Sequence, residues 1–161
     1  MAATTHFILF GLYPALLCAA IGTDIARRII PNLLVLALLA GFALLAVLAP
    51  LGDLSLRVMA AAAVTGVGFI LFSHDIIGAG DAKFAGALSL WVDPGQIPLF
   101  IIGCGLIGVA LTLAATVRAK GRALPQPIAF LTRAGESVPY GVALAGAGLL
   151  LHPWSSLMVL A

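Results

Sequence analysis

Residues 97–117 read IPLFIIGCGLIGVALTLAATV and contain no charged side chain. This is the least interrupted apolar stretch in the chain. The hydrocarbon core of a bilayer is about 30 Å thick and is crossed by a helix of about 20 apolar residues. The stretch therefore predicts a membrane-spanning helix from Ile97 to Val117. The other apolar runs of the sequence can be compared with it in length and in apolar character.

The composition extends this interpretation to the whole chain. Of the 161 residues, 63% are hydrophobic and 9% are charged, and the mean hydropathy is +1.21. Soluble domains carry about 25% charged residues, because a globule in water needs a polar surface. Disorder is excluded, since it requires low hydrophobicity and high charge. The net charge of +2 is too small to indicate a nucleic-acid partner. Lipid is the expected surroundings of most of the surface.

The apolar runs predict an all-α bundle of six transmembrane helices, which form a single domain over residues 1–161. Met1 to Phe10 lacks the basic region of a signal peptide, so the first run is expected to be a retained span. The fourth run is too short to cross alone, unless its helix begins at or before Asp81 or the bilayer thins locally. The six predicted spans cover approximately residues 6–23, 31–50, 55–73, 84–92, 97–117 and 138–151.

The basic residues divide unevenly between the two sides of this topology. Cytoplasmic loops are enriched in Lys and Arg. The side with more of these residues is therefore predicted to be cytoplasmic, and both termini are predicted to lie outside. Only Arg57 falls on the other side. The polar loop from Arg118 to Ser137 is expected to contact anionic lipid headgroups. The cytoplasmic set is Arg27, Arg28, Lys83, Arg118, Lys120, Arg122 and Arg133.

Two aspartates are predicted at the same depth on the cytoplasmic side. Asp24 ends the first span and Asp81 begins the fourth, and ionisable groups at a membrane are functional hypotheses by default. Aspartic proteolysis needs such a pair: one ionised carboxylate takes a proton from the attacking water, and the other, protonated, supplies a proton. Close carboxylates titrate as a unit. The sequence leaves open which of the two is the acid and which the base.

The residues around Asp81 read GAGDAK over 78–83. Gly78 and Gly80 are expected to leave room for a substrate backbone or a neighbouring helix. Lys83 has two interpretations, a contact with a carboxylate or substrate and a contact with lipid phosphate. Asp81 itself has a simpler alternative role as the N-cap of the fourth helix.

These segments resemble motifs of the prepilin peptidases, a family of GxGD-type membrane aspartic proteases. The stretch 78–83 is similar to the family's GxGDxK motif. Asp24, followed by Ile30-Pro31-Asn32, is similar to the first motif, in which an Asp precedes a helix start of the I-P-N type. Val138-Pro139-Tyr140-Gly141 resembles the P-x-G segment that opens the last helix. Order and spacing agree along nearly the whole chain.

The resemblance implies a multi-pass enzyme of the bacterial cytoplasmic membrane that removes the leader from prepilin or pseudopilin precursors. It implies Asp24 and Asp81 as the catalytic residues, with Gly78, Gly80 and Lys83 in supporting or substrate-binding roles and with no metal or organic cofactor. The long-form members carry an additional N-terminal region with a cysteine-containing loop, and nothing here matches it. The resemblance is therefore to the short enzymes of tight-adherence (Flp-type) pilus systems. N-methyltransferase activity and the oligomeric state stay open.

Other polar residues have simpler explanations. Asp75, close to Asp81, is expected to be a solvated loop charge, and Asp53 and Asp93 are expected in turns on the opposite side. The cysteines lie inside apolar runs, where ordinary helix packing is expected, and the histidines are too scattered to predict a metal site. These residues are Cys18, Cys104, His6, His74 and His152.

Two further classes of function remain as alternatives. A small proton-coupled transporter or channel subunit would place acids near the bilayer midplane and would have paired broken helices. The acids of this chain cluster at the predicted membrane edges instead. A non-catalytic scaffold of a secretion machine would tolerate the loss of either Asp24 or Asp81.

Overall fold

The computed structural model describes residues 2–120 and 138–160. Within these ranges the chain forms helices joined by short segments, without a β-strand. The prediction of an all-α protein is confirmed. Most of the predicted basic loop, with Arg122, Arg133 and Glu136, lies outside the described residues.

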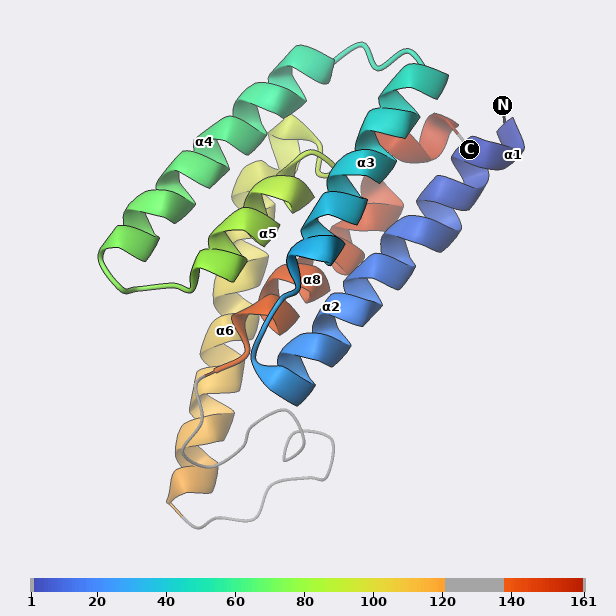
Figure 1. Cartoon of the computed structure of the whole chain (residues 1–161). Coiled ribbons are helices and arrows are strands. Elements are labelled where there is room, and N and C mark those ends of the chain that lie inside the picture. Colours follow the sequence, from blue (N-terminus) through green and yellow to red (C-terminus); the bar gives the residue numbers. More distant parts are fainter. Residues whose placement is uncertain (1, 121–137, 161) are drawn as a thin grey trace.

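The first predicted span is one continuous helix (Figure 1). It runs from α1 (Ala2–Phe7) through a π-helical turn, η1 (Ile8–Leu12), into α2 (Tyr13–Arg27). It ends where Arg28 takes a left-handed backbone conformation, with φ 55°. The prediction ended this helix too early, before Asp24. The carboxylate of Asp24 is turned into the bundle, so the last turn of α2 belongs to the packed structure and not to a loop.

Three other predicted spans coincide closely in position with helices of the structure. They are α3 (Asn32–Leu48), α4 (Leu54–Ser73) and α6 (Ile97–Ala119). Pro31 has an extended conformation, with ψ 136°, and caps α3 instead of occupying its first turn. Three helical segments are long and apolar enough to cross a membrane, and α3 is apolar but shorter; the three are Ala3–Arg27, Leu54–Ser73 and Pro94–Arg118.

Two further α-helices of the described residues are short and lie inside the bundle (Figure 1). These are α5 (Ala79–Ser89) and α8 (Tyr140–Leu151). Helix α5 packs against α3, α4 and α8, while α8 packs against α2, α5 and α6. Helix α5 begins before Asp81, which is one of the two conditions under which the fourth run is expected to be able to span. At 11 residues it is about 16 Å long, less than the thickness of a bilayer core.

Glycines allow α4 to approach α5 closely. A Cβ on Gly68 would lie 3.1 Å from the Cβ of Ala82, and a Cβ on Gly86 would overlap Oγ1 of Thr65. Small residues serve this purpose in membrane bundles. There the hydrophobic effect does not drive helices together, and close van der Waals packing of their backbones does so instead. The short central helix is therefore held by close packing with its neighbours.

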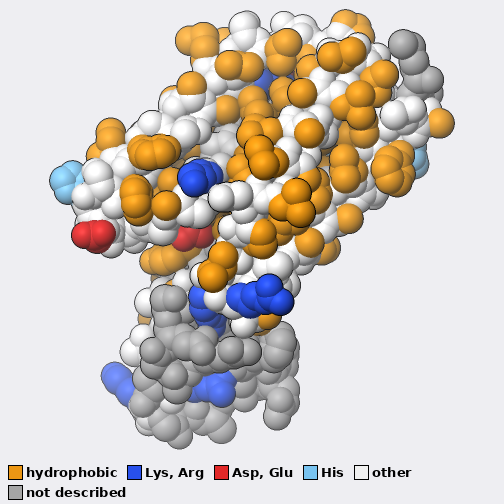
Figure 2. All heavy atoms as spheres, in the orientation of Figure 1, with side chains coloured by type: hydrophobic (Ala, Val, Ile, Leu, Met, Phe, Trp, Pro, Cys, Tyr) orange, Lys and Arg blue, Asp and Glu red, His pale blue; other side chains and the backbone are white. Residues whose placement is uncertain are grey.

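The outer surface is apolar. Side chains such as Leu36, Met59 and Leu106 are 60%, 67% and 67% exposed, and Figure 2 shows hydrophobic side chains spread over the visible face. Soluble monomers rarely expose contiguous apolar patches of more than a few hundred Å². Together with the long apolar helices, this surface identifies a membrane protein.

The two ends of the described chain meet at one end of the bundle (Figure 1). After α8 the chain continues through the short helices η3 (His152–Trp154) and η4 (Ser156–Leu160). The hydroxyl of Thr5 donates a hydrogen bond to the carbonyl of Leu160 at 3.2 Å. The other end of the bundle carries the last turns of α2, α4 and α6 and the first turns of α3, α5 and α8.

Candidate active site

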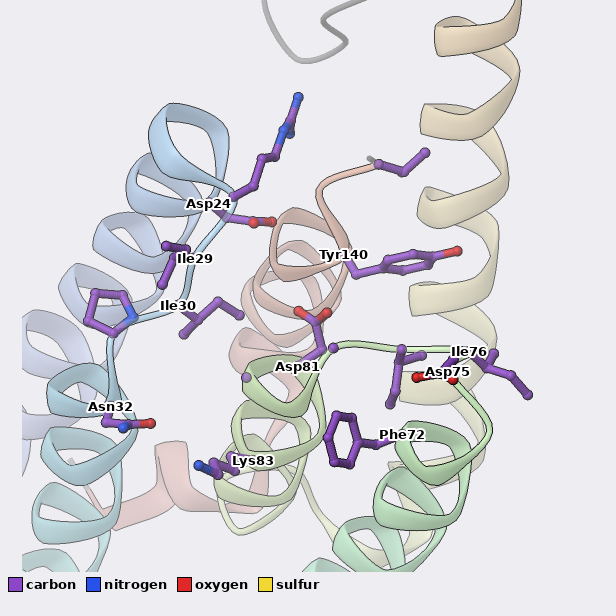
Figure 3. A pocket seen from close by; sticks show the side chains of 16 residues that line it. Asp24, Ile29, Ile30, Asn32, Phe72, Asp75, Ile76, Asp81, Lys83 and Tyr140 are labelled. Carbon is purple, nitrogen blue, oxygen red and sulfur yellow. The ribbon is translucent and has the colours of Figure 1, made fainter. Parts of the chain in front are cut away.

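A pocket of about 720 Å³ opens at that second end, where α2 ends and α5 and α8 begin. Figure 3 shows its lining, which comes from the segments between α2 and α3 and between α4 and α5, and from the first residues of α5 and α8. The five residues singled out in the sequence all line it: Asp24, Asp81, Gly78, Gly80 and Lys83. The fold thus brings them together, and their roles stay predictions.

Asp24 lies in the last turn of α2 and is 5% exposed. The backbone N–H of Val142 donates a hydrogen bond to its Oδ2 at 3.1 Å, and the backbone N–H of Gly141 donates to the same carboxylate. Both donors belong to the first turn of α8. The N-cap of α8 is Pro139, which has no side-chain oxygen to accept from these groups. Asp24 therefore caps α8 from another helix, although the Val142 N–H is shared with the carbonyl of Pro139, at 3.2 Å.

Gly141 is a site residue that the sequence analysis missed. A Cβ at this position would lie 2.8 Å from Oδ2 of Asp24 and 2.8 Å from Cδ1 of Ile30. Any side chain would displace the carboxylate, the loop after α2, or α8. The only signal in the sequence was the glycine of the P-x-G segment, which was noted there as a family motif without a physical role.

Asp81 is the third residue of α5, and the N-cap of that helix is Gly78. The alternative interpretation, in which Asp81 is the N-cap residue, is therefore wrong, because Gly78 occupies that position. Its carboxylate nevertheless accepts the backbone N–H of Gly78, which is half of a capping box. A Cβ on Gly78 would lie 3.0 Å from Oδ2 of Asp81.

Gly80 has no comparable steric constraint. A Cβ there would meet no atom closer than the Ile30 carbonyl oxygen, at 3.8 Å, which is an ordinary van der Waals contact. Of the two motif glycines, only Gly78 is tightly constrained by its contact with a carboxylate.

The two carboxylates come from different helices and are turned into the same open space (Figure 3). The charge of Asp24 acts directly on Asp81. Asp24 is buried and Asp81 half-buried. Two close carboxylates do not both ionise easily, so such a pair holds one proton over a wide pH range. A pair with one ionised and one protonated member is chemically able to activate water.

The remaining lining is mostly apolar, with one further acid. Asp75 is exposed, as expected for a loop charge, and has φ 56°, but it also lines the pocket. Tyr140, the first residue of α8, stands at the pocket with its side chain 42% exposed overall. The apolar lining residues are Ile29, Ile30, Pro31, Phe72, Ile76, Ile77 and Val138.

Asp53 and Asp93 do not contribute to this pocket. Both contact the Arg57 side chain, at the start of α4 and thus at the opposite end of the bundle from the pocket. Their predicted separation from the candidate site is confirmed. Among residues 2–120 and 138–160, no three His, Cys, Asp or Glu side chains cluster in a way that could hold a metal ion.

A model of the type IV leader peptidase family matches residues 11–113. The matched range covers more than half of the 161 residues and includes Asp24, Asp81 and the segment 78–83. Helix α8, which provides the hydrogen bonds to Asp24, lies beyond it. No curated protein and no solved structure matches the chain.

Proposed function

The chain belongs to the type IV leader peptidase family, and from this premise we propose that it removes the leader peptide from prepilin-like precursors, using Asp24 and Asp81 to activate water. The family makes it a protease with prepilin-type substrates. One observation carries the assignment of the two residues: aspartates from separate helices line one pocket and interact electrostatically there.

The proposed topology has six spans, with α5 and α8 as short central ones, and treats residues 1–161 as one domain of the bacterial cytoplasmic membrane. The charge distribution supports a cytoplasmic location of the pocket. Arg27 ends α2 and Arg118 lies in the last turn of α6, both at the pocket end. Cytoplasmic ends of spans are enriched in such residues.

The proposed substrate has a short leader, a small residue before the scissile bond and an apolar helix after it. The apolar lining around the carboxylates suits a short extended segment with small or apolar side chains. The apolar helix would share the bilayer with the enzyme and present the bond at a fixed depth. The short enzymes of tight-adherence pilus systems provide the proposed setting.

In the proposed reaction, one carboxylate is ionised and removes a proton from water as the water attacks the peptide carbonyl. The protonated carboxylate donates a hydrogen bond to the carbonyl oxygen and then a proton. No covalent bond to the enzyme forms, because the nucleophile is water. As the tetrahedral intermediate collapses, the carboxylate that took the proton from water gives it to the leaving amine, and a hydroxyl of the intermediate returns a proton to the other carboxylate.

The location of the acids argues against the transporter alternative. A proton relay would need ionisable groups along the middle of the bundle. Asp24 and Asp81 instead lie at one end, beside an open pocket, and the Arg57 cluster lies at the other end. The scaffold alternative requires no pocket and no interacting carboxylates.

Cleavage of a natural precursor tests the proposal. Purified protein in lipid vesicles is incubated with the prepilin encoded by the same organism, and the product is identified by mass and N-terminal sequencing. The expected result is one cut between the leader and the apolar helix. Intact precursor after prolonged incubation with folded protein contradicts the proposed function.

A further inference from the structure

We infer that Asp24 is the carboxylate that takes the proton from water, and that Gly141 and the amino end of α8 position it for this step. The inference rests on the proposed function. It assigns separate roles to the two aspartates, which the sequence leaves open, and it gives a role in the reaction to α8, which lies beyond the family match.

The donors around Asp24 favour its charged form. Two backbone N–H groups of α8, from Gly141 and Val142, point at its carboxylate. They lie at the amino end of a helix of 12 residues, where the helix dipole adds partial positive charge. The Arg28 guanidinium also acts on Asp24. Hydrogen bonds to a carboxylate and nearby cations both stabilise the ionised state.

The surroundings of Asp81 provide less of this support. One backbone N–H, that of Gly78, donates to its carboxylate, and the negative charge of Asp24 faces it. Asp81 lies at the amino end of α5, whereas Asp24 lies in the last turn of α2, where the helix dipole carries partial negative charge, so the helix dipoles do not distinguish Asp24 as the ionised member. Burial is the largest influence on both carboxylates and opposes the charged form of each, so the difference lies in the number of N–H donors and in the Arg28 cation. A proton shared by the pair therefore resides on Asp81 and leaves Asp24 as the base.

The position of Asp24 is fixed as well as its charge. Oδ2 and Cγ of Asp24 would lie 2.8 Å and 3.0 Å from a Cβ at position 141. Only the missing side chain of Gly141 lets the carboxylate reach the amide groups. A methyl group there would push the carboxylate away from its donors, and displacements of about 1 Å in an active site can cost about a hundredfold in rate.

The pocket contains a limited set of other titratable or charged side chains. Among the described residues that line it, these are Arg28, Asp75, Asp81, Lys83 and Tyr140. Of this set, Arg28 and Asp81 are the ones that interact electrostatically with Asp24. A change confined to Gly141 alters none of these charges, so its effect on the pH profile reports on the hydrogen bonds to Asp24.

The test compares Gly141→Ala with Gly146→Ala, a matched change on the same helix. A Cβ at Gly146 would meet only Cδ1 of the flexible Ile107 side chain, at 3.3 Å, and Gly146 does not line the pocket. Cleavage is measured from about pH 4 to 9, near the range where carboxyl groups titrate. Gly141→Ala should lower kcat about tenfold or more and leave KM within about twofold. Gly146→Ala should match wild type.

The pH profile gives the readout that a purely structural role would not change. Loss of donors to ionised Asp24 makes its protonation easier, so the acidic limb of kcat should move to higher pH in Gly141→Ala. A second variant, Val142→Pro, removes the N–H that donates to Asp24 and to the Pro139 carbonyl, and its ring suits the first turn of a helix. Val142→Pro should move the acidic limb of kcat to higher pH as well. If Gly141→Ala does not fold, Val142→Pro is used for the test instead.

The outcomes separate this inference from the proposed function. Inactive wild type and inactive Gly146→Ala would contradict the proposed function itself. Active wild type, together with a folded Gly141→Ala or Val142→Pro enzyme whose kcat and acidic limb are unchanged, would overturn the inference alone. A loss of kcat without movement of the limb in either folded variant would also overturn it.

Discussion

Arg57 is fully buried and donates a hydrogen bond to the carboxylate of Asp93, at the end of the bundle opposite the pocket. The same guanidinium donates to Asp53 at 2.9 Å and to the backbone carbonyls of Leu90 and Val92. Asp93 in turn accepts the backbone N–H of Ser156 at 2.7 Å. This network joins the start of α4, the segment after α5 and the carboxyl-terminal segment.

Replacement of Arg57 should destabilise the protein strongly. Arg57→Met would leave two carboxylates facing one another without their cation, and breaking a buried ion pair costs about 3–5 kcal/mol. Asp53 and Asp93 are 33% and 18% exposed in their side chains, so the lower end of that range is expected. The measurement is thermal unfolding in lipid, with Lys120→Met, an exposed position, as the control. Equal stability of the two variants would contradict the structural role of Arg57.

The same network predicts acid sensitivity. Burial raises the pKa of Asp93, but hydrogen bonds from Ser156 and Arg57 and the charge of Arg57 outweigh it, so the pKa of Asp93 lies below its usual value. A carboxyl group with a lowered folded pKa stabilises the fold above its unfolded pKa, about 3.9, and this contribution is lost as pH falls through the folded pKa. Wild type should therefore lose stability below about pH 4 more steeply than Asp93→Asn. Parallel stability–pH curves for the two proteins would contradict this.

Close packing of α4 on α5 gives a third prediction. Gly86→Ala places a methyl group against Thr65 and should destabilise the fold by about 1–3 kcal/mol, the usual cost of overpacking. Gly66→Ala is the matched control, because a Cβ there meets nothing within 4 Å. Adding Thr65→Ala to Gly86→Ala should restore most of the loss. No recovery in the double variant would show that the contact is not the cause.

Lys83 should affect substrate binding more than turnover. It lines the pocket two residues after Asp81 and is exposed, and exposed charge contacts contribute about 1 kcal/mol or less. Lys83→Met should therefore raise KM about threefold to fivefold with little change in kcat, and Lys83→Arg should keep most of the wild-type KM. The measurement is steady-state cleavage in vesicles without anionic lipid. A large loss of kcat with unchanged KM would place Lys83 in the chemistry instead.

Hydropathy predicted the long outer helices well, because a helix in contact with lipid must be apolar along its whole length. The inner helices follow a different rule. Helices α5 and α8 pack against other helices and have few exposed residues, so they can be short and rich in small residues. For this reason the run near Asp81 looked too short to be a span.

The sequence singled out Asp24 and Asp81, because a carboxylate at a membrane edge is costly and therefore conspicuous. It did not reveal what holds them. The hydrogen bond from Val142 to Asp24 joins residues 118 positions apart, and no local pattern encodes such a contact. The steric role of Gly141 was equally hidden, because it depends on the path of α2 past α8.

Cleavage by single aspartate variants tests the central claim most directly. Wild type, Asp24→Asn, Asp81→Asn and Asp75→Asn are compared in lipid at equal folded concentration on the same prepilin. Asn preserves size and polarity but cannot exchange the proton. The account predicts a loss of about a hundredfold or more in kcat for Asp24→Asn and for Asp81→Asn, with Asp75→Asn within about twofold of wild type because Asp75 is an exposed loop charge. Near-normal turnover by either Asp24→Asn or Asp81→Asn would contradict it.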